Sequence, residues 1–188
     1  MLHRCEQAHV VLQFVRCERD DADLDGRPFH QQAACAGVAE AHRRWASNVG
    51  HDTVGWQAEQ FEVSALRGRR ISVQELLGPG LSDDPLQNLG AWLESKEHEG
   101  FGFAYAFCFP PYGLQSRPGA PLGDAPLETL FADVWRHVLG DPNAQTEIWS
   151  WNTEWSPYFD DGREWWGTGL WTVDVDGAAV VVLASATD

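Results

Sequence analysis

The sequence contains no long hydrophobic run. None of its stretches approaches the roughly 18–20 apolar residues that a membrane-spanning helix requires. The apolar stretch at residues 10–15 is interrupted by Gln13 and followed by Arg16, so it predicts a strand and not the core of a signal peptide. Membrane-spanning and exported proteins are therefore disfavoured.

Cysteine is scarce, and the four cysteines are scattered: Cys5, Cys17, Cys35 and Cys108. No CxxC pair is present, so neither a structural zinc site nor a disulfide framework is indicated. Free thiols are typical of a reducing compartment, and we expect a cytoplasmic protein.

Motifs for common chemistries are also missing. The chain lacks GxGxxG after a strand, GxxxxGK[ST], GxSxG and HExxH. Asp21, Asp23 and Asp25 match the opening of a calcium-binding EF-hand loop, but Gln32 stands where that loop requires a bidentate glutamate. We therefore expect neither a metal ion nor a cofactor, and the sequence favours a non-enzymatic protein.

Positive charge is in short supply. There are 13 Lys+Arg against 28 Asp+Glu, for a formal net charge of −15. Nucleic-acid phosphates and anionic membrane surfaces both select basic surfaces, so neither is an expected partner. The deficit is uneven: residues 1–70 hold 9 basic and 10 acidic residues (net −1), and residues 71–188 hold 4 and 18 (net −14).

The hydrophobic share of 44% is sufficient for a folded core. Residues 9–16 predict a strand and residues 29–46 a helix. Later helices are predicted from Asp84, through Leu86, Leu89 and Leu93, and from Asp124 to Gly140, where apolar residues recur at helical spacing. The apolar stretch at residues 101–109 predicts a strand buried on both faces.

The end of the chain predicts a β-hairpin. Asp176–Gly177 is a strong two-residue turn signal, and centring the turn there pairs Trp171 with Val182 and Leu170 with Leu183. Residues 178–184 are apolar on both faces, so this strand is expected inside the sheet. The predicted fold is α+β, with a mainly antiparallel sheet and about three packed helices. Residues 1–70 form a near-neutral strand–helix segment, and residues 71–188 an acidic part of the same single domain.

Aromatic and acidic residues are concentrated together near the C-terminus. Eight of the ten tryptophans lie from Trp92 onward, and residues 150–167 link two predicted strands. This Trp-rich segment either packs onto the sheet or exposes a recognition surface, since Trp and Tyr are typical interface anchors. The candidate binding residues are Trp155, Tyr158, Asp160, Asp161, Glu164, Trp165 and Trp166.

Residues 105–114, 150–167 and 184–188 resemble a family of small uncharacterised bacterial cytoplasmic proteins with a Trp-rich C-terminal motif. In its acidity the chain is similar to the immunity proteins of bacterial toxin systems. The resemblance covers roughly residues 71–188, and no family function comes with it. The expected partner is a protein, a basic toxin domain being one form.

Three function classes stay open from the sequence. The leading hypothesis is a non-enzymatic module that binds a protein through complementary charge, an immunity protein against a basic toxin being one form. The first alternative is a hydrolase with paired carboxylates between Glu154 and Glu164, which requires a pocket holding both groups. The second is a small-ligand or sugar-binding domain, which requires a concave Trp-lined groove.

Overall fold

The computed structural model describes residues 12–19, 26–48, 62–95, 100–110 and 126–185. Its strands are β1 Leu12–Cys17, β2 Gly68–Arg70, β3 Ile148–Trp151, β4 Gly169–Val175 and β5 Ala178–Ala184. Its α-helices are α2 Gly26–Asn48, α3 Val73–Leu77, α4 Leu89–Glu94, α5 Phe103–Cys108, α6 Leu127–His137 and α7 Asp160–Trp165. Short 3₁₀ helices are η3 Val63–Ala65, η4 Pro85–Gln87 and η5 Pro157–Phe159.

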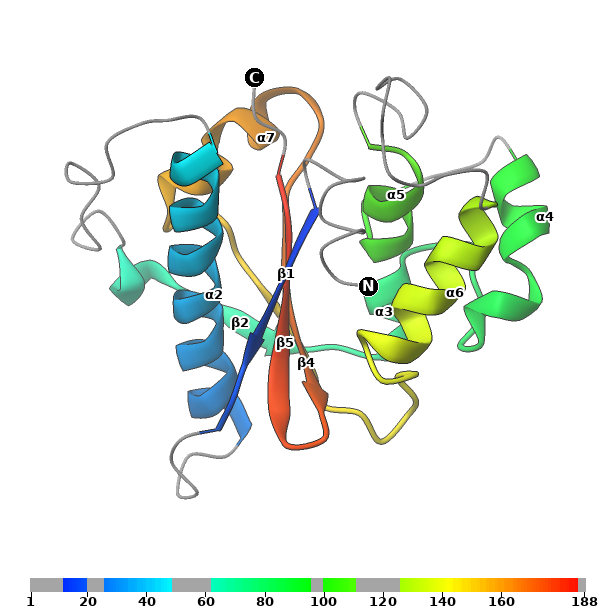
Figure 1. Cartoon of the computed structure of the whole chain (residues 1–188), viewed down its shortest axis with the longest axis horizontal. Helices are drawn as coiled ribbons and strands as arrows, with labels where there is room; N and C mark the ends of the chain where they lie inside the picture. The colour runs from blue at the N-terminus through cyan, green and yellow to red at the C-terminus, as the bar shows by residue number, and fades with distance from the viewer. Residues whose placement is uncertain (1–11, 20–25, 49–61, 96–99, 111–125, 186–188) are drawn as a thin grey trace.

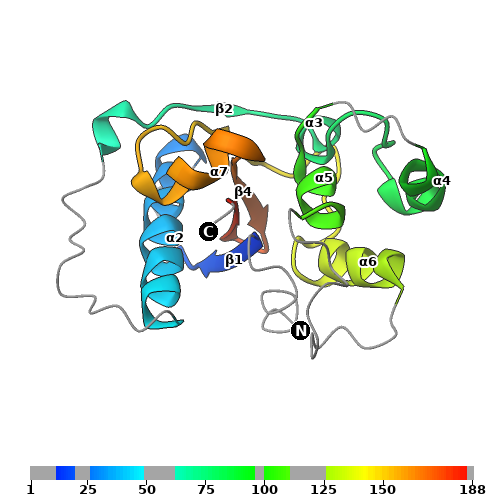
Figure 2. The same ribbon diagram turned by 90° about the horizontal axis from the view of Figure 1, so that it is seen from above.

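The strands form one antiparallel sheet in the order β1-β5-β4-β3-β2. Helix α2 covers one face of this sheet, and α3, α5 and α6 lie on the other (Figures 1 and 2). The predicted α+β class with a mainly antiparallel sheet is confirmed. Strand β1 pairs with β5, and β2 pairs with β3. Strands from the first 70 residues are therefore part of the same sheet as strands from the acidic later part.

The C-terminal hairpin has the predicted register. Trp171 pairs with Val182 and Leu170 with Leu183. Asp176 and Gly177 adopt φ angles of 54° and 78°, the left-handed values that a tight hairpin turn of this kind requires. Strand β5 lies between β1 and β4, and all of its residues are buried, as its two apolar faces predict.

Each face of the sheet carries its own hydrophobic core. On the α2 side, Phe29 and Val38 pack with Val181 and Leu183 of β5. On the other side, helices α3, α5 and α6 pack against alternate residues of the same strand, Val180 and Val182 among them. Burial on both faces places the sheet in the middle of a three-layer molecule.

The prediction of a strand at residues 101–109 was wrong, because this stretch forms helix α5. Five of its six residues are buried, including Phe103 and Phe107, whose rings both pack against Phe131 of α6. A short apolar run that is buried on all sides has no periodicity to distinguish a helix from a strand.

The predicted helix boundaries were largely correct. The Asp84 carboxylate accepts a hydrogen bond from the Leu86 amide (3.2 Å), although the first turn is the 3₁₀ helix η4 and α4 begins only at Leu89. After α6, Gly140 has a φ of 73°, as expected of a glycine that closes a helix. The predicted cap Asp124 and the EF-hand-like residues 21–25 lie outside the described residues.

Helix α2 approaches the sheet closely at Gly37. A Cβ atom at this position would lie 2.6 Å from Cγ1 and 2.8 Å from Cβ of Val181. These distances are shorter than any real carbon–carbon contact, so a side chain larger than hydrogen would push α2 away from β5. The α2 face against the sheet also includes the small residues Ala33, Ala34 and Ala41.

We expect Gly37→Ala to destabilise the fold, because the cost of overpacking a core, about 1–3 kcal/mol, exceeds the gain of about 1 kcal/mol from better helix propensity. The matched control is Gly90→Ala in α4, where an added Cβ meets no atom within 4 Å. Urea unfolding should place Gly37→Ala below Gly90→Ala by about 2 kcal/mol in free energy of unfolding. Equal stability of the two variants would show that α2 is not held at this distance.

Candidate functional site

The Trp-rich segment, residues 150–167, connects β3 to β4 through η5 and α7. It lies over the end of the sheet, close to the end of β5 (Figure 1). Ser156 caps η5, where its hydroxyl accepts a hydrogen bond from the Tyr158 amide (3.3 Å). Pro157 follows at the first helical position, so cap and proline set the direction of this turn.

Three large rings of this segment belong to the core on the α2 side: Trp151, Trp155 and Phe159. Trp155 is 1% exposed, and its indole N–H donates to the carbonyl of Asn152 (2.9 Å). The Trp151 ring lies over Gly68, its partner in β2, where a Cβ atom would come within 2.3 Å of the ring. These three rings therefore pack onto the sheet and do not form an exposed recognition surface.

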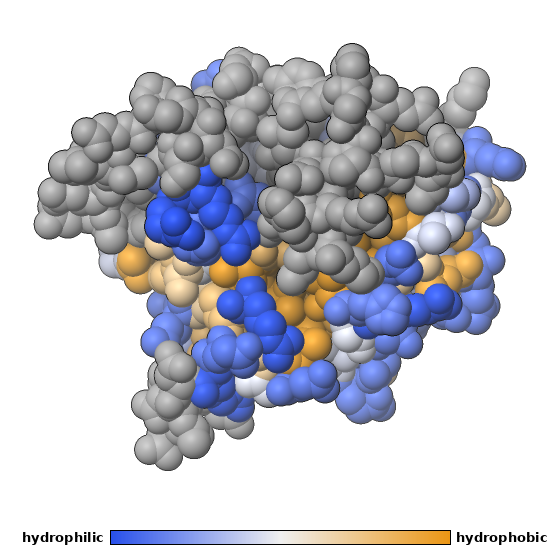
Figure 3. Space-filling model, viewed as in Figure 1, coloured by the Kyte–Doolittle hydropathy of each residue, from blue (hydrophilic) through white to orange (hydrophobic). Residues whose placement is uncertain are grey.

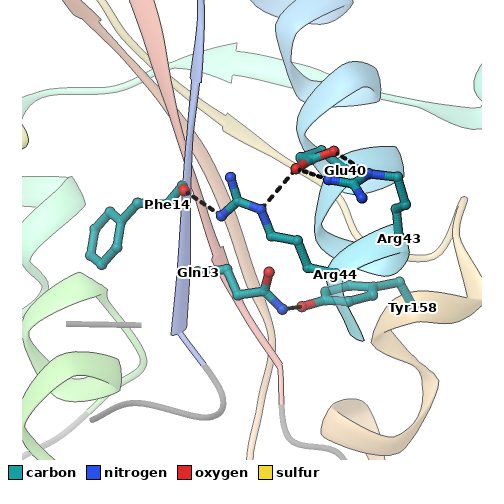
Figure 4. Close-up of polar contacts among 6 residues, drawn as sticks. All are labelled: Gln13, Phe14, Glu40, Arg43, Arg44 and Tyr158. Atoms are coloured by element: carbon teal, nitrogen blue, oxygen red, sulfur yellow. Dashed lines mark hydrogen bonds and ion pairs between the residues drawn. The ribbon is translucent and has the colours of Figure 1, made fainter. Parts of the chain in front are cut away.

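Tyr158 is half-buried and connects the segment to the first strand. Its hydroxyl accepts a hydrogen bond from the Gln13 side-chain amide at 2.9 Å (Figure 4). Its carbonyl accepts one from the Ser185 hydroxyl (3.3 Å). Burial raises the pKa of this phenol, so the hydroxyl stays protonated. Tyr158 therefore holds η5 against both β1 and the end of β5.

A charged cluster on α2 lies beside this contact. Glu40 accepts hydrogen bonds from Arg43 (2.7 Å) and Arg44 (2.9 Å), and these guanidinium groups lower the pKa of Glu40 to about 2 (Figure 4). Arg44 also donates to the carbonyl of Phe14 in β1 (3.3 Å). Helix, strand and Trp-rich segment are thus joined by side-chain bonds at one corner of the molecule.

Trp166 is half-buried on the opposite side of the segment. Its ring packs edge-on against Phe101 at 5.2 Å between centroids, and its indole N–H donates to the carbonyl of Phe109 (3.3 Å). Trp166 therefore bridges the two ends of the α5 region. Asp161 and Trp165 belong to α7, but their side chains lie outside the described part of the structure.

The carboxylates of the segment point to solvent. Glu154, Asp160 and Glu164 are exposed. Asp160 forms an ion pair with Arg163, which also donates to the carbonyl of Thr153 (2.9 Å). The Glu154 carboxylate accepts a hydrogen bond from the Thr153 amide (3.1 Å). Buried aromatic rings therefore fix the backbone of a segment whose outer surface is mainly acidic.

Sequence reasoning did not detect a buried polar network beneath this segment. The His30 ring is fully buried, and its Nδ1 lies 2.8 Å from the Thr172 hydroxyl. The Trp151 indole N–H donates to the same hydroxyl (3.0 Å). Because a hydroxyl has one donor and two acceptor sites, Thr172 can bond to either neutral tautomer of His30 while it accepts from Trp151. The other ring nitrogen of His30, Nε2, has no hydrogen-bond partner among the described residues.

Burial lowers the pKa of His30 below its ordinary value of 6.5. The folded state therefore favours the neutral ring, and its contribution to stability is complete above about pH 6.5 and is lost as the pH falls. We expect the free energy of unfolding to decrease between about pH 8 and about pH 5, and His30→Phe to reduce this pH dependence without abolishing it. A residual slope is expected because burial also lowers the pKa of His42, to about 4.

The measurement is denaturant unfolding of wild type and His30→Phe at both pH values. The slope is the informative quantity, since the variant also removes the hydrogen bond between His30 and the Thr172 hydroxyl. Identical slopes for the two proteins would show that His30 does not titrate differently in the folded and unfolded states.

Among the described residues, no helix has the length and apolarity to cross a membrane. Within the same residues, no group of three His, Cys, Asp or Glu side chains is placed to hold a metal ion. Comparison with known proteins yields no matching family model, no matching curated protein and no matching solved structure.

Proposed function

We propose that this protein is a non-enzymatic binding module for a basic protein, and that neutralising a bacterial toxin domain is its specific role. The observation that carries the proposal is the exposed carboxylate surface of Glu154, Asp160 and Glu164 on a segment fixed by buried rings. Complementary charge accelerates the encounter of two proteins and disfavours wrong partners.

The anchoring of the segment supports this role. Tyr158 bonds to Gln13 of β1, and Trp155 and Arg163 bond to main-chain carbonyls within the segment itself. A surface that is already ordered loses little conformational entropy on binding, so more of the interaction energy appears as affinity. This argument applies to a partner that meets α7 and η5 as a rigid surface.

The distribution of charge also supports it. In the part of the chain that the structure describes, the arginines of the first 70 residues lie on or next to α2, β1 and β2, and several are paired with carboxylates, as Arg19 is with Asp174 and Arg69 with Glu75. The later part of the chain carries the net charge of −14. A basic partner is therefore attracted to surfaces of this later part, α7 among them.

The roles proposed for the candidate residues differ with their burial. Trp155 supports the surface from inside, since it is 1% exposed. Tyr158 and Trp166 retain part of their surface, and with Asp160 and Glu164 they are the described residues proposed to contact the partner. Asp161 and Trp165 are proposed for the same surface from their positions in α7.

No specific observation favours the two alternative functions. Glu154, Asp160 and Glu164 are exposed, and none of them lines the groove that the structure has between α4 and α6. That groove is not lined by tryptophan either, as a sugar-binding groove of the kind considered would be.

The test uses the product of the gene adjacent to the one encoding this protein, with binding followed by biolayer interferometry. Glu164→Lys is a cleaner variant than a reversal at Asp160, because Asp160 is paired with Arg163. We expect Glu164→Lys to lower the association rate about three- to tenfold and to weaken its salt dependence, since long-range charge acts mainly on encounter.

The control is Glu18→Lys, which changes the net charge equally at an exposed position just after β1, where Glu18 is paired with Arg16. It should leave the association rate close to that of wild type, and circular dichroism should show both variants folded. An equal effect of the two substitutions would mean that only net charge matters, and absence of binding would contradict the immunity role.

A further inference from the structure

We infer that the groove between α4 and α6 is a docking site for a cationic amphipathic helix of the partner protein. This inference deepens the proposed function, because it adds an apolar contact site to the recognition of a basic protein. Helices α4 and α6 lie next to each other at the end of the molecule away from α7 (Figures 1 and 2).

The groove has a volume of about 370 Å³ and an apolar floor. Leu89 is buried, and Leu86 and Ala132 are half-buried beside it. The rim is polar, with Glu128, Thr129, Asp133 and Arg136 supplied by α6. Over this part of the molecule, hydrophobic surface lies between hydrophilic residues (Figure 3). An apolar stripe between two helices with a charged rim is the kind of groove that accepts an amphipathic helix.

Gly90 is the second observation. It lies in the first turn of α4, where alanine is a better helix former than glycine, and it is exposed in the groove. An added Cβ would meet no atom within 4 Å, so packing inside this chain does not require glycine here. The absence of a side chain leaves the α4 backbone accessible to a closely packed partner.

The charge of the rim selects a cationic occupant. Among the described residues, Glu128 and Asp133 form no ion pair, and Arg136 is the one cation in the groove lining. The approach to α4 adds the exposed Asp83, and its end adds the exposed Glu94. Lysine or arginine on the flanks of a docked helix would neutralise these carboxylates while its leucine-like face covers the floor.

This site adds apolar contact area to the little that Tyr158 and Trp166 of the Trp-rich segment leave exposed. Interface affinity comes mainly from apolar anchors that are buried on binding. Trp151, Trp155 and Phe159 are already buried inside this chain and are not available for that purpose. The groove, by contrast, has Leu86 and Ala132 only half covered.

The experiment measures binding of a helical leucine–lysine peptide of about 14 residues, with its leucines on one face, to the full chain at about 0.1 M salt. A peptide of the same composition in scrambled order is the probe control. We expect the amphipathic peptide to bind more tightly and to shift the amide NMR signals of α4 and α6.

The decisive variant is Gly90→Trp, which fills the groove from a position with open space and should weaken peptide binding about tenfold or more. Gly90→Ala removes the glycine without filling the groove and should bind as wild type does. Glu128→Lys should also weaken binding, and Glu18→Lys, with the same charge change, should not. Circular dichroism verifies that each variant is folded.

Equal binding by wild type and Gly90→Trp, equal binding of the scrambled peptide, or shifts located outside α4 and α6 would each overturn the inference. Glu164→Lys separates the two proposals. If Glu164→Lys slows association with the adjacent gene product while Gly90→Trp leaves peptide binding unchanged, the docking site in the groove is excluded and the proposed function stands. If the peptide binds in the groove but the adjacent gene product does not bind, the proposed function fails and the docking site stands.

Discussion

Burial of β5 on both faces is the constraint on which the rest of the structure depends. A strand of seven buried residues inside a sheet must be covered from both sides, because neither face can be left in water. Helix α2 covers one face at a distance set by Gly37, and α3, α5 and α6 cover the other. The Trp-rich segment extends the α2-side core to the end of the sheet. Its acidic surface is held in place by the same apolar layer that stabilises the fold.

The two acidic surfaces lie at opposite ends of the molecule and differ in what they offer a partner. The α7 end presents carboxylates on a rigid backbone, whereas the α4–α6 end combines carboxylates with an apolar floor. Charge at both ends favours the approach of a basic protein, but apolar area is needed to retain it. A partner that contacts both would have to reach across the sheet layer, and one that contacts a single end would leave the other available.

Local signals predicted the elements that depend on neighbouring residues. The Asp176–Gly177 turn determined the hairpin register, and the apolar stripe from Leu127 to Leu139 determined α6. The stretch at residues 101–109 was assigned to the wrong element because uniform hydrophobicity carries no period. Which tryptophans are buried could not be predicted from the sequence. The Trp151 ring packs over Gly68, which lies more than eighty residues earlier in the chain. The groove likewise requires α4 and α6 to meet, and the His30 network requires α2 to lie on β4.

The pairing of β1 with β5 has a consequence for how this protein is made. Residues 12–17 pair with residues 179–184, so β1 has no sheet partner among the described strands until β5 has been synthesised. Strand β5 also lies inside the sheet, where both hydrophobic cores contact it. Contacts of such long sequence separation close slowly. A chain interrupted before β5 would leave β1 and β4 with unpaired inner edges, and such edges are open to association with other strands.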